Sequence, residues 1–467
     1  MYVDFSSYDN QSCLDLSGAE VTTLKGIYDG DPEDVSNIQQ VILPHGLVAI
    51  AGNAFDNIPV ESIDLPSSVR EIGVAAFMSG HMTYVKLPED CKTVGLGAFA
   101  CNQITAFTWP AVELHGFSGF HGNKLASLKI PSNVKSLGKL AFADNPLQSI
   151  EFEEGIDTIG FGAFACKPNG AGYIALCDVE PSDPTYTPLQ SISFPRSLKR
   201  IEPQAFYKAR SLKTIDFAEG LISIGYEAFY YCDTLQSISL PSTLRSVGSK
   251  AFGDCKMIKH VDLNEGLTSI SADAFAGCNI IDDLYIPGSL TTIKSLAFQG
   301  AFARETEVSV VFGEGVATIE ENAFYVYLYS ASQPVTRLRL QFPHTLRSIG
   351  SNAFGGVWLP ETELPLVAET GDSLRWDAYL DGALVEEGVR TIGGLNKSGY
   401  TAYSRRSYVA TVIPHQTALP NTAAQQDVVL FDINGRKIYR GPKDSMPSLR
   451  GLYVLRQPDG SARLLKL

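Results

Sequence analysis

The sequence predicts an elongated, β-rich α/β solenoid of about thirteen repeats of 22–23 residues, followed by a small all-β domain. Two observations carry this prediction. Residues 212–234, 235–257 and 258–280 align on one pattern: L-x-x-I-x-L, a turn, then L-x-x-I-x-x-x-A-F-x-x-C. The Ala-Phe pair of that pattern also recurs at nearly constant spacing through most of the chain. Self-similarity at such a period is typical of stacked repeats.

The phenylalanines of this pair give the number of repeats. The steps between them are 22, 22, 21, 22, 22, 42, 23, 23, 23, 23, 26 and 30 residues. The step of 42 equals one repeat with an insertion of about twenty residues, for which we expect a loop. The thirteen positions are Phe55, Phe77, Phe99, Phe120, Phe142, Phe164, Phe206, Phe229, Phe252, Phe275, Phe298, Phe324 and Phe354.

One repeat, residues 235–257, indicates how the unit folds. Ile238 and Leu240 alternate with serines, which predicts a strand with one buried face. Pro241 then ends the strand because it has no N–H to donate, and Phe252 closes the core from the opposite side. A single repeat buries roughly five or six large side chains, each worth about 1.5–3 kcal/mol. This cannot offset the backbone entropy lost on ordering about 22 residues, at about 1–2 kcal/mol per residue. Each repeat therefore needs its neighbours to fold.

The motif L-x-x-L-x-L at this period resembles a leucine-rich repeat. With Leu-Pro or Glu-Gly after the strand and I-G-x-x-A-F-x-x-C beyond it, the fuller motif resembles the BspA-like leucine-rich repeat proteins found on the surfaces of Bacteroidetes and other host-associated microbes. The resemblance covers about residues 38–356. It implies a right-handed superhelix and an adhesive or binding role.

Two forms of the strand-end turn occur, and they alternate in the second half of the chain. We interpret them as two solutions to one turn and not as a functional code. The proline form is carried by Pro66, Pro131, Pro195, Pro241 and Pro287, and the Glu-Gly form by Glu154, Glu219, Glu265 and Glu314.

Composition narrows the classes of partner. The net charge of −14 argues against nucleic acid, because phosphate binding needs clustered lysine and arginine. No stretch reaches the roughly 20 apolar residues of a membrane span.

We expect residues 1–37 to form an N-terminal cap on a solenoid at 38–358, since solenoids need an atypical end unit. Residues 1–20 lack the basic and apolar regions of a signal peptide. Either the protein is cytosolic or a leader is missing from this sequence, and the C-terminal motifs below favour the second.

Five cysteines follow the phenylalanines closely. Free cysteine is among the most buried residue types, so we expect one column of buried, reduced thiols. Metal binding would need ligands that converge on one point, whereas a column spreads them along an axis. The alternative is a disulfide between Cys166 and Cys177. The five are Cys101 and Cys166, two residues after their phenylalanine, and Cys232, Cys255 and Cys278, three residues after theirs.

Two segments depart from the repeat. Residues 167–188 are rich in Pro, Gly, Asp and Tyr, which predicts a loop. Long loops on a rigid scaffold often carry function, although a tolerated insertion without a role is the alternative. Residues 325–334 are tyrosine-rich, and we expect them to pack against the C-terminal region.

The residues that alternate with the buried strand positions form two columns, which we expect on the concave face. One column ends in Tyr285, Val311 and Arg339, and the other in Asp283, Ser309 and Arg337. Solenoids use such surfaces for binding, and a solvated polar face without a ligand is the alternative. The predicted binding residues are Tyr84, Lys86, His260, Asp262, Asp283, Tyr285, Arg337 and Arg339.

No catalytic motif is present. Residues 116–120 read GFSGF in place of G-x-S-x-G, and neither H-E-x-x-H nor a P-loop occurs. His115 and His121 flank the atypical fourth repeat and are a weak candidate for a metal pair. His260 and Asp262 would lie on an open sheet, where water is not excluded. We therefore predict no enzymatic activity, cofactor or metal.

The pattern changes at about Leu359, and residues 359–467 predict a β-rich C-terminal domain. Hairpins are expected at 428–440 and 451–467, around an Asn-Gly and an Asp-Gly turn. The tail resembles the C-terminal sorting domains of the type IX secretion pathway, with their D-x-x-G-R-x-[IV] and G-x-Y motifs. A plain hairpin domain is the alternative. The matching residues are Asp432, Gly435, Arg436, Ile438, Gly451 and Tyr453.

Together these features predict a non-enzymatic leucine-rich repeat protein that is secreted or held on the outer cell surface. Its expected role is protein–protein interaction or adhesion to a host or microbial surface protein. The alternative is a glycan-binding accessory protein, and a third hypothesis is an enzyme with its site in residues 360–467.

Overall fold

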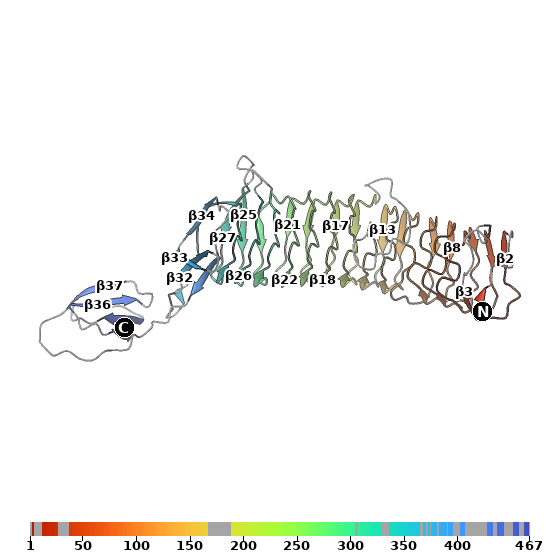
Figure 1. Ribbon diagram of the computed structural model, residues 1–467, viewed down its shortest axis with the longest axis horizontal. Helices are drawn as coiled ribbons and strands as arrows, with labels where there is room; N and C mark the ends of the chain where they lie inside the picture. Colours follow the sequence, from red (N-terminus) through yellow and green to blue (C-terminus); the bar gives the residue numbers. More distant parts are fainter. Residues whose placement is uncertain are drawn as a thin grey trace.

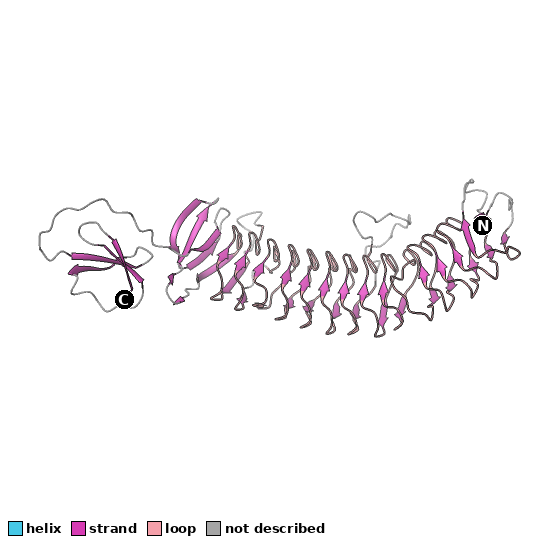
Figure 2. Ribbon diagram, turned by 90° about the horizontal axis from the view of Figure 1, so that it is seen from below, coloured by secondary structure: helices cyan, strands magenta, loops and turns pink. Residues whose placement is uncertain are grey.

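The computed structural model describes residues 2–3, 12–26, 37–166, 188–303, 307–327 and 336–364, together with the strands between 368 and 466. It shows a long array of stacked turns that curves along its length (Figures 1 and 2). The described residues form strands and turns and no helix, so the predicted α/β solenoid is a β-solenoid. No helix in this described part is long and apolar enough to cross a membrane.

Each turn of the solenoid contributes a strand to a first row, labelled along one side of the array in Figure 1. Neighbouring strands of the row run parallel, and paired residues hold equivalent positions in successive repeats, as Ser237 does with His260. The first row consists of β2 (Cys13–Asp15), β4 (Gln40–Ile42), β6 (Ser62–Ile63), β8 (Tyr84–Lys86), β10 (Ala106–Thr108), β11 (Ser127–Ile130), β13 (Ser149–Phe152), β15 (Ser191–Ser193), β17 (Thr214–Asp216), β19 (Ser237–Ser239), β21 (His260–Asp262), β23 (Leu284–Ile286), β25 (Glu307–Phe312), β27 (Arg337–Gln341) and β29 (Trp358–Glu363).

A second row of shorter strands follows the strand-end turns. It is interrupted at the atypical fourth repeat, where only isolated bridges such as Phe117 with Leu137 are described. The second row consists of β1 (Tyr2–Val3), β3 (Thr23–Gly26), β5 (Ala49–Ile50), β7 (Glu71–Ile72), β9 (Thr93–Val94), β12 (Ser136–Leu137), β14 (Thr158–Ile159), β16 (Arg200–Ile201), β18 (Ser223–Ile224), β20 (Ser246–Val247), β22 (Ser269–Ile270), β24 (Thr292–Ile293), β26 (Thr318–Ile319) and β28 (Ser348–Ile349).

The Ala-Phe segments form the third side of each turn. All thirteen phenylalanines lie in one file, with ring centroids of successive members 5.1–6.1 Å apart. This confirms the repeat count. Lys250 and Asp254, two residues either side of Phe252, have φ of 55° and 54°. Left-handed residues at these positions turn the chain around each phenylalanine, so this side forms no regular strand although Phe252 N–H still donates to the Ala274 carbonyl.

Six of the described repeats bury an asparagine or a cysteine at the third residue after the phenylalanine, and together these form a buried polar column. Three repeats of about 22 residues hold asparagine there: the side chain of Asn123 donates to the Phe99 and Phe120 carbonyls and accepts the Ile104 N–H at 3.0 Å. Three 23-residue repeats hold cysteine, and the Cys255 thiol donates to the Phe229 carbonyl at 3.2 Å. The other members are Asn102, Asn145, Cys232 and Cys278.

The cysteine prediction is therefore correct for three residues and wrong for Cys101. Cys232, Cys255 and Cys278 are buried free thiols in one column. Cys101 is disulfide-bonded. Cys166 is not in a disulfide, so the alternative bond from Cys166 is not formed. Cys101 and Cys166 come one residue too early to enter the column.

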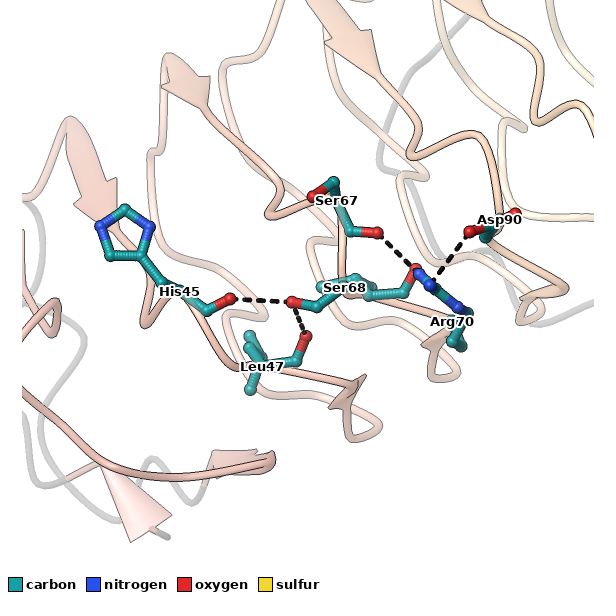
Figure 3. Close-up of polar contacts among 7 residues, drawn as sticks. His45, Leu47, Ser67, Ser68, Arg70 and Asp90 are labelled. Carbon is teal, nitrogen blue, oxygen red and sulfur yellow. Dashed lines mark hydrogen bonds and ion pairs between the residues drawn. The ribbon is translucent and has the colours of Figure 1, made fainter.

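Hydrogen bonds between consecutive turns hold the strand-end corner together. Figure 3 shows one such corner: the hydroxyl of Ser68 contacts the carbonyl oxygens of His45 and Leu47 in the preceding repeat, at 3.0 and 2.6 Å. Arg70 forms an ion pair of 3.0 Å with Asp90 in the following repeat. Each corner thus satisfies backbone groups of its neighbour that stacking would otherwise bury unpaired.

The chain beyond β29 continues both rows in the antiparallel sense. The first row is extended by β34 (Thr391–Leu395), which pairs with β29. The second row is extended by β35 (Ala402–Arg406), which pairs with β28 on one side and with β32 (Arg375–Leu380) on the other. The outermost strand of this sheet is β33 (Ala383–Val389), which pairs with β32. Added antiparallel strands cover the last parallel edges of the solenoid. A short pair, β30 (Ala368–Glu369) and β31 (Asp372–Ser373), lies between them in the chain.

The last strands form a separate four-stranded antiparallel sheet in the order β37-β36-β38-β39. These are β36 (Asp427–Asp432), β37 (Lys437–Pro442), β38 (Leu452–Arg456) and β39 (Ala462–Lys466). Asp432 and Tyr453 of the sorting motifs are register partners. Gly435, Arg436 and Gly451 lie outside the described residues, as do the two hairpin turns, residues 167–187 of the insertion and 328–335 of the tyrosine-rich segment.

Candidate functional site

The C-terminal end of the first row carries most of the predicted binding residues. His260 and Asp262 lie on β21, Asp283 and Tyr285 at β23, and Arg337 and Arg339 on β27, and all six are exposed. Because strands of a sheet are about 4.8 Å apart, these side chains occupy one continuous surface roughly 15 Å long. With Glu307 of β25 and Trp358 of β29, we call this surface the β21–β29 patch.

The register of the patch differs from the predicted one. Ser309 pairs with Arg339, and Val311 pairs with Gln341, so Arg339 lies in the column of Asp283 and not in that of Tyr285. Arg337 is the partner of Glu307. The predicted columns placed β27 two residues out, although the 30-residue step from Phe324 to Phe354 gives the observed register. A slip of two leaves the alternation of buried and exposed residues unchanged, so the strand pattern did not reveal it.

Contacts within the patch fix several of its side chains. The hydroxyl of Tyr285 donates to the Glu265 carboxylate at 2.7 Å, which raises the pKa of Tyr285. The guanidinium of Arg339 donates through Nε and Nη2 to one carboxylate oxygen of Glu307, at 3.1 and 2.6 Å. Asp283 accepts the Ser309 N–H at 2.9 Å. Asp283 and Arg339 therefore lie two strands apart in one column, as opposite charges held by separate partners.

Arg337 and Trp358 form the end of the patch. The guanidinium carbon of Arg337 lies 5.5 Å from the centroid of the Trp358 ring, within cation–π distance. Trp358 remains 36% exposed. Sequence reasoning missed Trp358 because it lies where the repeat pattern ends. It missed Glu307 because two exposed positions were taken from each strand, Ser309 and Val311 in β25, whereas this longer strand begins at Glu307. An exposed aromatic residue directly after the last Ala-Phe pair was the available signal.

Tyr84 and Lys86 are not part of this patch. Both lie on β8, seven strands of the first row before β21, which corresponds to roughly 34 Å. Tyr84 is 48% exposed, and its register neighbour on β10 is Ala106. The structure therefore separates the eight predicted residues into a group of six and an isolated pair.

The histidine pair of the fourth repeat is also divided. His115 is exposed and lies 2.9 Å from a carboxylate oxygen of Glu113. His121 is only 2% exposed, and neither of its ring nitrogens has a hydrogen-bond partner. Burial lowers the pKa of His121 to about 4. Within the described ranges, no group of three His, Cys, Asp or Glu side chains is placed to hold a metal ion.

A stacked phenylalanine file, carried by repeats of mostly 22–23 residues, is the recurring structural feature of this chain. A family model described as "BspA type Leucine rich repeat region", in six copies, matches residues 13–115, 112–170, 185–304 and 299–373. This chain belongs to that family. BspA-type repeats are generally non-catalytic scaffolds, and membership indicates a role in protein interaction.

The solved structures that match this chain include two described as leucine-rich repeat proteins. A protein from Bacteroides ovatus is 23% identical, over 64% of this chain and 83% of its own, with a TM-score of 0.38. A protein from Eubacterium ventriosum is 19% identical, over 60% and 82%, with a TM-score of 0.41. The pneumococcal vaccine antigen PcpA is 18% identical, over 73% and 86%, with a TM-score of 0.45. No curated protein matches this chain.

Proposed function

We propose that this BspA-type protein is secreted or held on the outer cell surface and binds a host or microbial surface protein through the β21–β29 patch. The observation that carries the proposal is the exposure of Tyr285, Trp358 and two arginines on neighbouring strands of one rigid row. Tyrosine, tryptophan and arginine are the residue types enriched where binding energy concentrates in protein interfaces.

The rigidity of the patch supports the same role. Its strands are tied to neighbours by parallel ladders and carried on a continuous core, so little conformational entropy would be lost on binding. Side chains such as Arg339 are already held by their own contacts. A surface of this kind favours recognition of a partner by many modest contacts along an extended face.

Charge reversal tests the proposal. The variant D262K/R337E/R339E should lose binding to purified matrix proteins and mucins that the parent binds, with an unchanged melting temperature. The matched control K92E/K256E/E321K makes the same net charge change at exposed positions outside the patch. Equal binding by both variants would place the site elsewhere on the molecule, and absence of any bound protein would remove the adhesive role.

Glycan binding is the second candidate function. Exposed aromatic rings beside carboxylates are suited to stack on and hydrogen-bond to sugars, and Tyr285 with Glu265 has this arrangement. A glycan array probed with the full chain separates the two functions. Retention of a defined oligosaccharide by the parent, lost in Tyr285→Ala, would favour this alternative over protein binding.

We also propose that the protein is exported through a type IX pathway, because its tail resembles the sorting domains of that pathway. The experiment is expression of the chain with and without residues 427–467 in a bacterium that has this pathway. Protease accessibility of the solenoid on intact cells should require the tail. Equal surface exposure of both chains would leave the four-stranded sheet with a structural role only.

A further inference from the structure

We infer that the β21–β29 patch binds an extended polypeptide segment that carries an acidic and a basic residue four positions apart; this inference rests on the function proposed above. It follows from how charge is distributed along the patch. The two ends of the patch have opposite sign, and the distance between them is set by the strand spacing of the row.

The acidic end lies at β21 and β23. Asp262 accepts a hydrogen bond from the Ser239 hydroxyl at 3.1 Å, and Asp283 accepts the Ser309 N–H. Asp282, two residues before β23 begins, lies 3.4 Å from Nδ1 of His260. These three carboxylates have no lysine or arginine partner within the described residues, so their charge is available to a basic side chain of a ligand.

The basic end lies at β27. Arg339 is neutralised by Glu307 at 2.6 Å, whereas the guanidinium of Arg337 stacks on Trp358 and has no carboxylate partner in the described part of the chain. A stacked guanidinium keeps its N–H edge free, and that edge matches the two oxygens of a carboxylate. Arg337 is therefore pre-oriented for an acidic side chain of a ligand.

The spacing selects the ligand. Arg337 on β27 is two strands from Asp283, and the ladder register places Asp283 in the column of Arg339, two residues along the strand from Arg337. Two strand spacings of about 4.8 Å and two residues of about 3.3 Å put the two positions roughly 12 Å apart. An extended chain rises about 3.3 Å per residue and alternates faces, so two residues on one face span about 7 Å when two apart and about 13 Å when four apart. Only the spacing of four reaches from Arg337 to Asp283. Tyr285, two residues from Asp283 on the same face, would contact an apolar residue beside the basic one.

Synthetic peptides of roughly eight residues test this, with the full chain as receptor. One carries a glutamate and a lysine four positions apart in a Thr-Val-Thr background, a second has the same composition with the charges adjacent, and a third carries two glutamates. We expect the first to bind at least about tenfold more tightly than the others. The ratio of the dissociation constants of the control peptides to that of the first peptide should fall toward one at about 0.5 M salt, where charges a few ångströms apart are screened.

Two variants complete the test. Arg337→Glu should abolish the preference, whereas Arg337→Lys should retain part of it, and melting temperatures report that both are folded. Equal binding of all three peptides, or tighter binding of an anionic oligosaccharide than of any peptide, would overturn the inference. If D262K/R337E/R339E still loses a matrix protein while the peptides are not distinguished, the proposed function stands and the charge pattern is wrong.

Discussion

Glu219 and Ser242 are joined twice across neighbouring repeats: the backbone N–H and the hydroxyl of Ser242 both donate to the Glu219 carboxylate, at 3.0 and 2.9 Å. The bond is reciprocated, because the N–H of Gly220 donates to the Thr243 hydroxyl at 2.8 Å. A Glu-Gly turn thus caps the proline turn of the following repeat, which explains why the two forms alternate. Glu154 likewise accepts the backbone N–H groups of Arg196 and Ser197, and Glu314 accepts that of His344.

The capping carboxylates predict a loss of stability in acid. Hydrogen bonds from the Ser242 backbone and hydroxyl lower the pKa of Glu219 below its usual value. The folded state therefore favours the ionised form, so its contribution is present above the unfolded pKa and is lost as pH falls through the folded pKa. Glu219→Gln should lower the melting temperature at pH 7 and have little effect near pH 3. Glu61→Gln, at an exposed site, is the control.

The phenylalanine file predicts a large penalty for truncation. Phe252 is fully buried between Phe229 and Phe275, with ring centroids 5.3 and 5.5 Å away. Phe252→Ala should lower the free energy of unfolding by about 3–5 kcal/mol, measured by denaturant titration. Ser237→Ala, exposed on β19, should change it by less than about 0.5 kcal/mol. Similar values for the two variants would contradict a shared core.

Repeat length decides which residue the buried column tolerates. Asn123→Cys should cost about 1–3 kcal/mol, because it leaves the Ile104 N–H without an acceptor. In the 23-residue repeats the extra residue lets the backbone supply that acceptor, as Ile258 N–H donates to the Cys255 carbonyl at 3.1 Å. Cys255→Ala should therefore cost less than Asn123→Cys in the same titration. The reverse order would refute this account of the column.

The buried imidazole of His121 predicts a second pH effect. Burial lowers its pKa from 6.5 to about 4, so the unfolded state binds the proton more readily between these values. The free energy of unfolding should have its full value above pH 6.5 and should fall by up to about 3 kcal/mol as the pH drops toward 4. His121→Ala, which matches Ala100 and Ala143 at equivalent positions, should remove this slope. The exposed His115→Ala should leave the pH profile of the melting temperature unchanged.

The sequence by itself determined the architecture of this protein. A spaced Ala-Phe pair and a period-2 strand pattern repeat so regularly that only stacking can bury the side chains of Ile238 and Phe252. The number of repeats, the buried face of each strand and the absence of a separate core in any one repeat all followed from spacing, because a solenoid places each residue next to its equivalent in the next turn.

Tertiary structure alone decided the relations that depend on register and on contacts between turns. The pairing of Arg339 with Glu307, the position of Trp358 under Arg337 and the cap of Glu219 on Ser242 join residues 21 to 32 positions apart. Repeat spacing sets which residues pair in the ladder, but a side-chain partner can lie off that register, as Arg339 bonds Glu307 while Arg337 pairs with it, and local sequence does not encode this offset. Folding sets it, because each turn must satisfy the backbone groups that its neighbour leaves exposed.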